Sequence, residues 1–172
     1  MKNFKSQKGL VRRNLGEGGF TLIEILVVIG LIAILAAVVL IAINPARQFA
    51  QGRDSQRISN LNAILNAVSQ RIVDGKGNFT APFTVGPTTY TCPTLPTGIG
   101  ASSTVATVSG SGLINLSCLV PTYIPSFPYD PTYGTASTTA YVIYQDSIGR
   151  VHVAATSTEP SITRTTELEV TR

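Results

Sequence analysis

The chain has 172 residues, of which 44% are hydrophobic and 13% are charged, against roughly 25% charged residues in an ordinary soluble domain. Its net charge of +4 is confined to residues 1–19. This leader holds Glu17 and five basic residues: Lys2, Lys5, Lys8, Arg12 and Arg13. Because residues 20–172 are net neutral, direct nucleic-acid binding is not predicted, and the leader is interpreted as a membrane-topology signal.

A continuous apolar stretch, residues 20–43, follows the leader and is interrupted only by Thr21, Glu24 and the small Gly30. As a helix it would extend roughly 36 Å, enough to cross the hydrocarbon core of a bilayer. A buried core helix is rarely apolar on all faces over such a length. Because the leader is basic, we expect it on the cytoplasmic side of the inner membrane, with the rest of this single-pass chain outside.

Glu24 lies one turn into the apolar stretch, where an ionised side chain is costly and is taken as functional by default. The positive end of the helix dipole favours an anion at this position. A second partner would arise if the chain were cut before Phe20, because the new α-amine could neutralise the carboxylate within one subunit or between neighbours. The alternative is a glutamate that snorkels to the interface and has no role.

Residues 18–24 read Gly-Gly-Phe-Thr-Leu-Ile-Glu, between the basic leader and the apolar run. This segment resembles the processing site of type IV prepilins and type II secretion pseudopilins, and the resemblance covers residues 18–43. It implies that a prepilin peptidase cuts after Gly19 on the cytoplasmic side and N-methylates Phe20. It also implies that Glu24 pairs with the Phe20 amine of an adjacent subunit in a homo-oligomeric filament. An inner-membrane assembly platform with a cytoplasmic assembly ATPase is the further partner implied.

A second helical segment, residues 44–75, is expected next. Pro45 should kink or unwind the helix near residues 41–45, because proline cannot donate a backbone hydrogen bond; this break comes a few residues later than in well-studied pilins. An apolar stripe predicts packing on the protein's own domain, with a coiled-coil seam as the alternative. The stripe consists of Ile58, Leu61, Ile64, Leu65, Ala67, Val68 and Ile72. The opposite, polar face consists of Arg57, Asn60, Asn62, Asn66, Gln70 and Arg71. Gly75 is expected to end the helix in the left-handed conformation.

Residues 76–172 are expected to form an exported β-rich domain. The predicted fold class is therefore α+β: a long N-terminal helix packed on a small antiparallel sheet, as in pilins. Alternating patterns predict a hairpin of strands at residues 140–144 and 150–154, and further strands at residues 113–116 and 166–170. Four prolines punctuate residues 121–131, which we expect to be an ordered loop without strand pairing.

Cys92 and Cys118 are the only cysteines, and both fall in the exported domain. An even count in an oxidising compartment favours a disulfide, which would stabilise the domain by roughly 3–4 kcal/mol. A metal site at these residues is not expected, because two cysteines and one distant histidine supply too few ligands. That histidine, His152, is expected to point to solvent.

No catalytic constellation and no glycine-rich phosphate loop is recognisable, so we expect a structural protein that is not an enzyme and needs no cofactor. Asp130 and Asp146 are the only charged residues between Gly77 and Gly149. They could help to bind calcium, as the resemblance to major pseudopilins implies. A hard cation needs six or more oxygen ligands, however, and two carboxylates supply only part of them.

The combined interpretation is a structural subunit of a type IV pilus-like filament, which lies outside the cytoplasm after assembly. The alternative in the same class is a major pseudopilin of a type II secretion system, confined to the periplasm. An alternative from another class is a signal-anchored binding module outside the cytoplasm. The neutral, Ser/Thr-rich domain and its cysteine pair favour a displayed pilin. No sequence pattern distinguishes adhesion, motility, DNA uptake and export.

Overall fold

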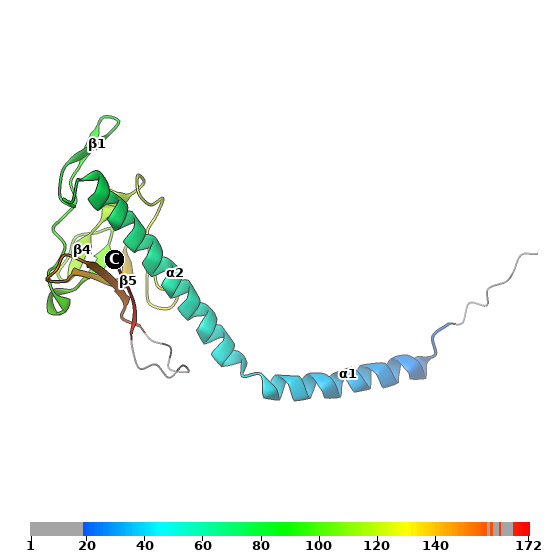
Figure 1. The fold of residues 1–172 in the computed structure, drawn as a ribbon. Coiled ribbons are helices and arrows are strands. Elements are labelled where there is room, and N and C mark those ends of the chain that lie inside the picture. Colours follow the sequence, from blue (N-terminus) through cyan, green and yellow to red (C-terminus); the bar gives the residue numbers. More distant parts are fainter. Residues whose placement is uncertain (1–18, 158, 160–161, 163–166) are drawn as a thin grey trace, which may run out of the picture. The chain divides into compact units, whose positions relative to one another are not determined.

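The structure is a computed structural model that describes residues 19–157, 159, 162 and 167–172 (Figure 1). The predicted basic leader lies outside these described residues, apart from Gly19. Internal packing divides the chain into two compact units, Met1–Asn44 and Pro45–Arg172, and each is described by itself. The first contributes one helix, and the second combines a helix with two sheets, so the fold class is α+β as predicted.

The helix of the first unit is α1, Leu22–Ala42. It begins two residues later than the predicted stretch, because Thr21 has an extended backbone and caps the helix. Within the described part of the chain, one helix is long and apolar enough to cross a membrane, over Leu22–Ile41, and none of that window is buried. Ile43 is extended, with its N–H donating to the carbonyl of Val39 at 3.0 Å, and the helix stops there.

The helix of the second unit is α2, Pro45–Asp74. The break predicted near Pro45 therefore falls between Ala42 and Pro45. Proline suits the first turn of a helix because its missing N–H would have no partner inside the helix. Residues 45–49 are all exposed, and burial begins at Ala50.

The structure corrects the predicted faces of α2. Arg57 and Arg71 were expected on the polar face, yet they are 0% and 1% exposed, whereas Ile58 of the predicted stripe is 42% exposed. The buried residues are Ala50, Asp54, Arg57, Leu61, Ile64, Leu65, Ala67, Val68 and Arg71. At spacings of three and four residues, both arginines share the helix face of the leucines. Their burial is tolerated because acidic and carbonyl groups of the domain meet them.

The C-terminal end of α2 also differs from the prediction. The left-handed residues are Lys76, with φ 53°, and Gly77, with φ 91°, rather than Gly75. The N–H of Gly77 donates to the carbonyl of Ile72, and that of Lys76 donates to the carbonyl of Val73, which is a Schellman arrangement. Gly75 is needed for a different reason: a Cβ at this position would overlap the carbonyl oxygen of Asn78.

The larger sheet has five strands in the order β4-β3-β5-β6-β7 (Figure 1). They are β3 Ser103–Ala106, β4 Leu113–Asn115, β5 Thr138–Gln145, β6 Val151–Ala155 and β7 Leu168–Thr171. The predicted hairpin is confirmed as the antiparallel pair β5–β6, and a terminal strand pairs antiparallel with β6. The sheet is not purely antiparallel, because β3 and β4 run parallel. Of the predicted terminal strand, residue 166 lies outside the described residues.

A second, two-stranded sheet pairs β1, Phe83–Val85, with β2, Thr88–Tyr90, and it was not predicted. Its base is an aromatic cluster, in which Phe83 stacks on Tyr90 and meets the edge of Tyr123. The guanidinium of Arg71 lies 4.5 Å from the centre of the Phe83 ring and donates to the carbonyl of Ala81. This cation–π contact ties the two-stranded sheet to the end of α2.

The core of the second unit lies between α2 and one face of the five-stranded sheet, as predicted. Alternate residues of the sheet face this core, among them Tyr141 and Ile143 of β5 and Val151 and Val153 of β6. Short 3₁₀ turns at Ile99–Ala101 and Ser117–Leu119 connect the strands. Residues 121–131 contain no strand, in agreement with the proline pattern.

Candidate functional site

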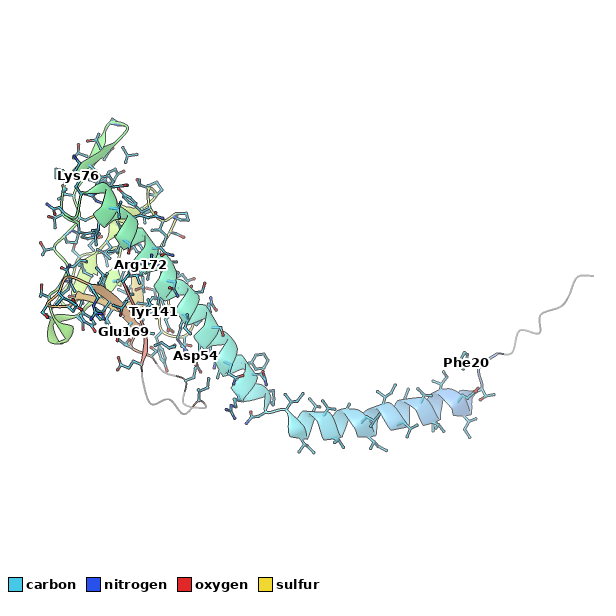
Figure 2. The ribbon with its side chains drawn as sticks, in the orientation of Figure 1. Phe20, Asp54, Lys76, Tyr141, Glu169 and Arg172 are labelled. Carbon is cyan, nitrogen blue, oxygen red and sulfur yellow. A yellow bond between two sulfur atoms is a disulfide. The ribbon has the colours of Figure 1, made fainter. Side chains whose placement is uncertain are left out.

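The segment before α1 is open and accessible (Figure 2). Gly19 and Phe20 are not helical, both are exposed, and the Phe20 side chain is 83% exposed. A Cβ placed on Gly19 would meet no atom of the described residues within 4 Å. Peptidases cleave most readily at exposed segments with small residues. Cleavage between Gly19 and Phe20 stays a prediction, and the exposed, non-helical backbone of both residues is compatible with it.

Thr21 and Glu24 form a reciprocal capping box at the start of α1. The Glu24 N–H donates to Thr21 Oγ1 at 3.2 Å, and Glu24 Oε2 accepts from the Thr21 N–H at 3.0 Å. The Thr21 hydroxyl also donates to Glu24 Oε2, at 3.0 Å. Together these bonds satisfy donors that a helix N-terminus otherwise leaves unpaired. They hold the carboxylate at the positive end of the helix, directed toward the N-terminal side.

This position brings Glu24 close to the place where cleavage would create a new charge. Glu24 Oε2 already accepts a hydrogen bond from the Thr21 N–H. The new amine would belong to Phe20, the residue directly before Thr21. Glu24 Oε2 accepts two of the three bonds of the capping box, one from the Thr21 N–H and one from the Thr21 hydroxyl. The structure thus adds Thr21 to the residues of this site, as the group that orients the carboxylate. The Ser/Thr-x-x-Glu spacing is the sequence signal for this role.

The remaining surface of α1 is apolar on all sides. Leu22 is 82% exposed and Ile41 is 87% exposed, and large aliphatic side chains between them are about half exposed or more. Water is a poor solvent for such a surface, whereas lipid or the helices of neighbouring subunits would cover it.

Asp130, the first calcium candidate, lies instead in a buried ion-pair network. Its carboxylate accepts from Arg57 Nε at 2.6 Å and from the N–H groups of Thr132 and Tyr133. Burial by itself raises the pKa of Asp130, but the hydrogen bonds from Arg57 and from the two backbone N–H groups lower it overall. Asp130 is 1% exposed, so this carboxylate anchors the proline-rich loop to α2.

The same arginine gathers two further carboxylates. Arg57 Nη1 lies 2.6 Å from Glu159 Oε1 and 3.0 Å from Asp54 Oδ1, and Arg53 donates to Glu159 as well. The hydrogen bond from Arg53, assisted by that from Arg57, lowers the pKa of Glu159 to about 2. The sequence analysis did not predict this network, although Asp54 and Arg57 share the helix face of the apolar stripe, which is a sequence signal for it.

Asp146, the second calcium candidate, lies at the β5–β6 turn in another network. It accepts from Arg150 Nε at 2.8 Å, and its Oδ2 lies 3.2 Å from His152 Nε2. Burial raises the pKa of Asp146, but the hydrogen bonds from Arg150 outweigh it and lower the value overall. The His152 ring stacks on Tyr144, with centroids 4.6 Å apart, and its other nitrogen meets Glu169. The prediction that His152 points to solvent is wrong, since its side chain is only 13% exposed.

Asp130 and Asp146 thus take part in separate networks. Among the described residues, no cluster of three or more His, Cys, Asp or Glu side chains could hold a metal ion. The calcium site stays a prediction.

A disulfide joins Cys92 and Cys118 in the structure, with Cα atoms 5.4 Å apart. Both residues are buried in the core, at 2% and 7% exposure. The bridge links the segment after β2 to the 3₁₀ turn at Ser117–Leu119 and closes a loop with a sequence separation of 26 residues.

Comparison with known families finds one match, to the prokaryotic N-terminal methylation motif, at residues 15–40. The matched residues include Gly19, Phe20, Thr21 and Glu24 and most of α1. No curated protein and no solved structure matches the chain.

Proposed function

From the methylation motif at residues 15–40, which is the signature of type IV pilins and pseudopilins, we propose that the chain is the structural subunit of a type IV pilus-like filament. The motif supports a pilin-like or pseudopilin substrate of prepilin peptidase. With the apolar helix, it supports a precursor anchored in the membrane. Cleavage falls between Gly19 and Phe20, the new Phe20 amine is N-methylated, and an inner-membrane platform with its ATPase assembles the mature subunits.

The methylation motif carries this proposal, and the exposure of α1 agrees with it. The window Leu22–Ile41 has a mean hydropathy of 3.1, and no part of it is buried among the described residues. In the precursor, lipid covers this surface. In a filament, the α1 helices of neighbouring copies replace the lipid, so one helix serves both states. Loss of the leader removes the whole net charge of +4, leaving a neutral subunit that can pack against itself.

Glu24 sets the axial position of the subunits in this proposal. The carboxylate is costly in an apolar surrounding unless a cation meets it. The Phe20 amine of an adjacent copy supplies that cation once the leader has gone. Thr21 keeps the Glu24 carboxylate at the helix terminus by two hydrogen bonds. There the carboxylate lies next to the residue that follows Phe20 of its own subunit, and the Phe20 amine of a neighbouring subunit can approach it.

A displayed fibre is the form that the exported domain favours. Between Gly77 and Gly149 the only charged residues are Asp130 and Asp146. Asp130 is buried and forms an ion pair with Arg57, and Asp146 forms an ion pair with Arg150. This part of the domain therefore presents a surface rich in uncharged Thr and Ser. Surface fibres in electron micrographs support the displayed pilin, whereas a periplasmic filament with an export defect on deletion identifies a pseudopilin.

Substitutions at Glu24 test the assembly mechanism. Glu24→Gln keeps the capping box, since glutamine can also accept the Thr21 N–H, but it removes the charge. Glu24→Ala removes both. We expect both variants to be cleaved like the unaltered chain and both to lose most of their sheared-fibre yield. Immunoblots of the membrane fraction measure cleavage, and the sheared fraction measures assembly.

The two variants separate charge from capping. If Glu24→Gln assembled as well as the unaltered chain while Glu24→Ala did not, capping rather than charge pairing would be the role of Glu24. Undiminished fibres from both variants would remove Glu24 from the mechanism.

A further inference from the structure

The first turn of α2 has no place in the core of its own unit. Residues 45–49 are exposed, and Phe49 is 70% exposed. Contact with the domain begins at Ala50, which is 0% exposed, and continues through Asp54 and Arg57 on the same helix face. An aromatic side chain is thus presented outward directly before the helix joins its domain.

The only charged side chains between Glu24 and Asp54 are positive. No acidic residue occurs between Glu24 and Asp54, whereas Arg47 and Arg53 both lie in this interval. Arg47 is exposed and stands two residues before Phe49. An aromatic ring beside an arginine is a combination typical of the membrane–water interface, where the ring enters the lipid and the cation meets phosphate.

Covalent reach keeps this turn close to the interface whatever direction α2 takes. The window Leu22–Ile41 has 20 residues, which as a helix extend about 30 Å, the thickness of the hydrocarbon core. Ile41 then lies at the outer edge of that core. Phe49 follows Ile41 by eight residues, or about 12 Å along a helix, so its side chain stays within reach of the headgroup layer, which is roughly 5–8 Å thick on each side.

We propose that residues 44–49 form an interfacial anchor, in which the Phe49 ring inserts at the glycerol level of the outer leaflet. Arg47 binds the phosphate of anionic headgroups in the same layer. Lipid is the occupant because this turn is continuous with the membrane span and carries no acidic group. The inference rests on the membrane-anchored precursor of the proposed function. The anchor holds the start of α2 at the membrane surface before a subunit is taken into a filament.

A single tryptophan tests the anchor, because the natural chain contains none. The full chain carrying Phe49→Trp is placed in nanodiscs of phosphatidylethanolamine and phosphatidylglycerol, with lipids brominated near the glycerol as quenchers. Val73→Trp is the matched control, since Val73 is 74% exposed on the same helix, about 36 Å further along. We expect brominated lipid to quench the Phe49→Trp variant several-fold more strongly than the Val73→Trp variant.

Three comparisons complete the test. Ile34→Trp probes the middle of the span, where Ile34 is 65% exposed, and lipids brominated deep in the acyl chains should quench it. If they do not, the span and the proposed function fail together. If they do, but Phe49→Trp behaves like Val73→Trp, only the anchor is overturned. Protection of Phe49→Trp from acrylamide without quenching by brominated lipid identifies a protein contact and also overturns it.

Arg47→Glu, added to Phe49→Trp, tests the headgroup contact. The proposal predicts that this change weakens quenching in discs containing phosphatidylglycerol and has a smaller effect in neutral discs. Equal effects in both lipids overturn the role of Arg47.

Discussion

Arg57 is the residue at which α2 is joined to two distant segments of its unit. Its guanidinium meets Asp130 and Glu159, which lie 73 and 102 residues further along the chain. It also meets Asp54 on the preceding turn of the helix. The side chain is 0% exposed, so these carboxylates replace the water that the guanidinium has lost.

Removing this cation should therefore cost more than removing its neighbour. Arg57→Met leaves Asp54, Asp130 and Glu159 in the interior without their central partner, and we expect the free energy of unfolding to fall by about 3–5 kcal/mol. Arg53→Gln is the matched control: its side chain is 40% exposed, so solvent screens its ion pair and we expect a much smaller loss. Urea unfolding of the full chain in detergent measures both. Equal losses would show that Arg57 is not the centre of the network.

The same network predicts the response to acid. Glu159 has a pKa lowered from 4.5 to about 2 by the hydrogen bonds from Arg53 and Arg57. A lowered pKa in the folded state means that the stability is present above pH 4.5 and is lost as the pH falls toward 2. Asp130, whose pKa is also lowered, adds to the loss in acid.

Glu159→Gln should flatten this dependence, because glutamine does not titrate. Unfolding free energies measured from neutral pH down to acid check the slope in both proteins. A variant that loses stability as steeply as the unaltered chain over this range would exclude Glu159 as the titrating group.

Sequence patterns single out residues whose partners are close along the chain and miss residues whose partners are distant. Glu24 is conspicuous because a carboxylate interrupts an apolar run, and its capping partner Thr21 is three residues away. Arg57 is on the apolar stripe by spacing, but an arginine is normally assigned to the solvent face. Only the positions of Asp130 and Glu159 in three dimensions reverse that assignment.

At the scale of elements, α2 offers a matched pair of glycines. A Cβ on Gly52 would meet no atom within 4 Å, whereas a Cβ on Gly75 would overlap the Asn78 carbonyl oxygen. Gly52→Ala should stabilise the unit by about 0.5–1 kcal/mol, because alanine favours the helix. Gly75→Ala should destabilise it, since the chain leaving the Schellman turn at Lys76 must shift (Figure 2).

Thermal unfolding of the two variants, followed by circular dichroism, measures these opposite signs. If Gly75→Ala were as stable as the unaltered chain, the claim that the Asn78 carbonyl leaves no room for a Cβ at residue 75 would be contradicted.

Elements with strong local patterns were predicted well. The β5–β6 hairpin follows from alternating residues around a turn, and α1 from an uninterrupted apolar run. The strand predicted at residues 113–116 is confirmed as β4, but β3 and its parallel pairing with β4 were missed because β3 is only four residues long, too short for a pattern. The β1–β2 pair was missed for the same reason of length.

At the scale of the whole molecule, the two units have opposite solvent requirements. The unit Pro45–Arg172 buries its own apolar side chains in a core closed by a disulfide. The unit Met1–Asn44 contains a helix whose apolar surface is not covered by any of the described residues. In the proposed function, lipid covers this surface first and other copies of the chain cover it later. We propose that removal of the charged leader sets this order.

The N-terminus of the mature chain therefore tests the account most directly. Intact-mass and N-terminal peptide mass spectrometry are applied to the membrane and fibre fractions of cells that contain a prepilin peptidase. The account predicts a chain that begins with N-methylated Phe20 and lacks residues 1–19. A mature membrane fraction in which the chain still begins at Met1 would contradict it.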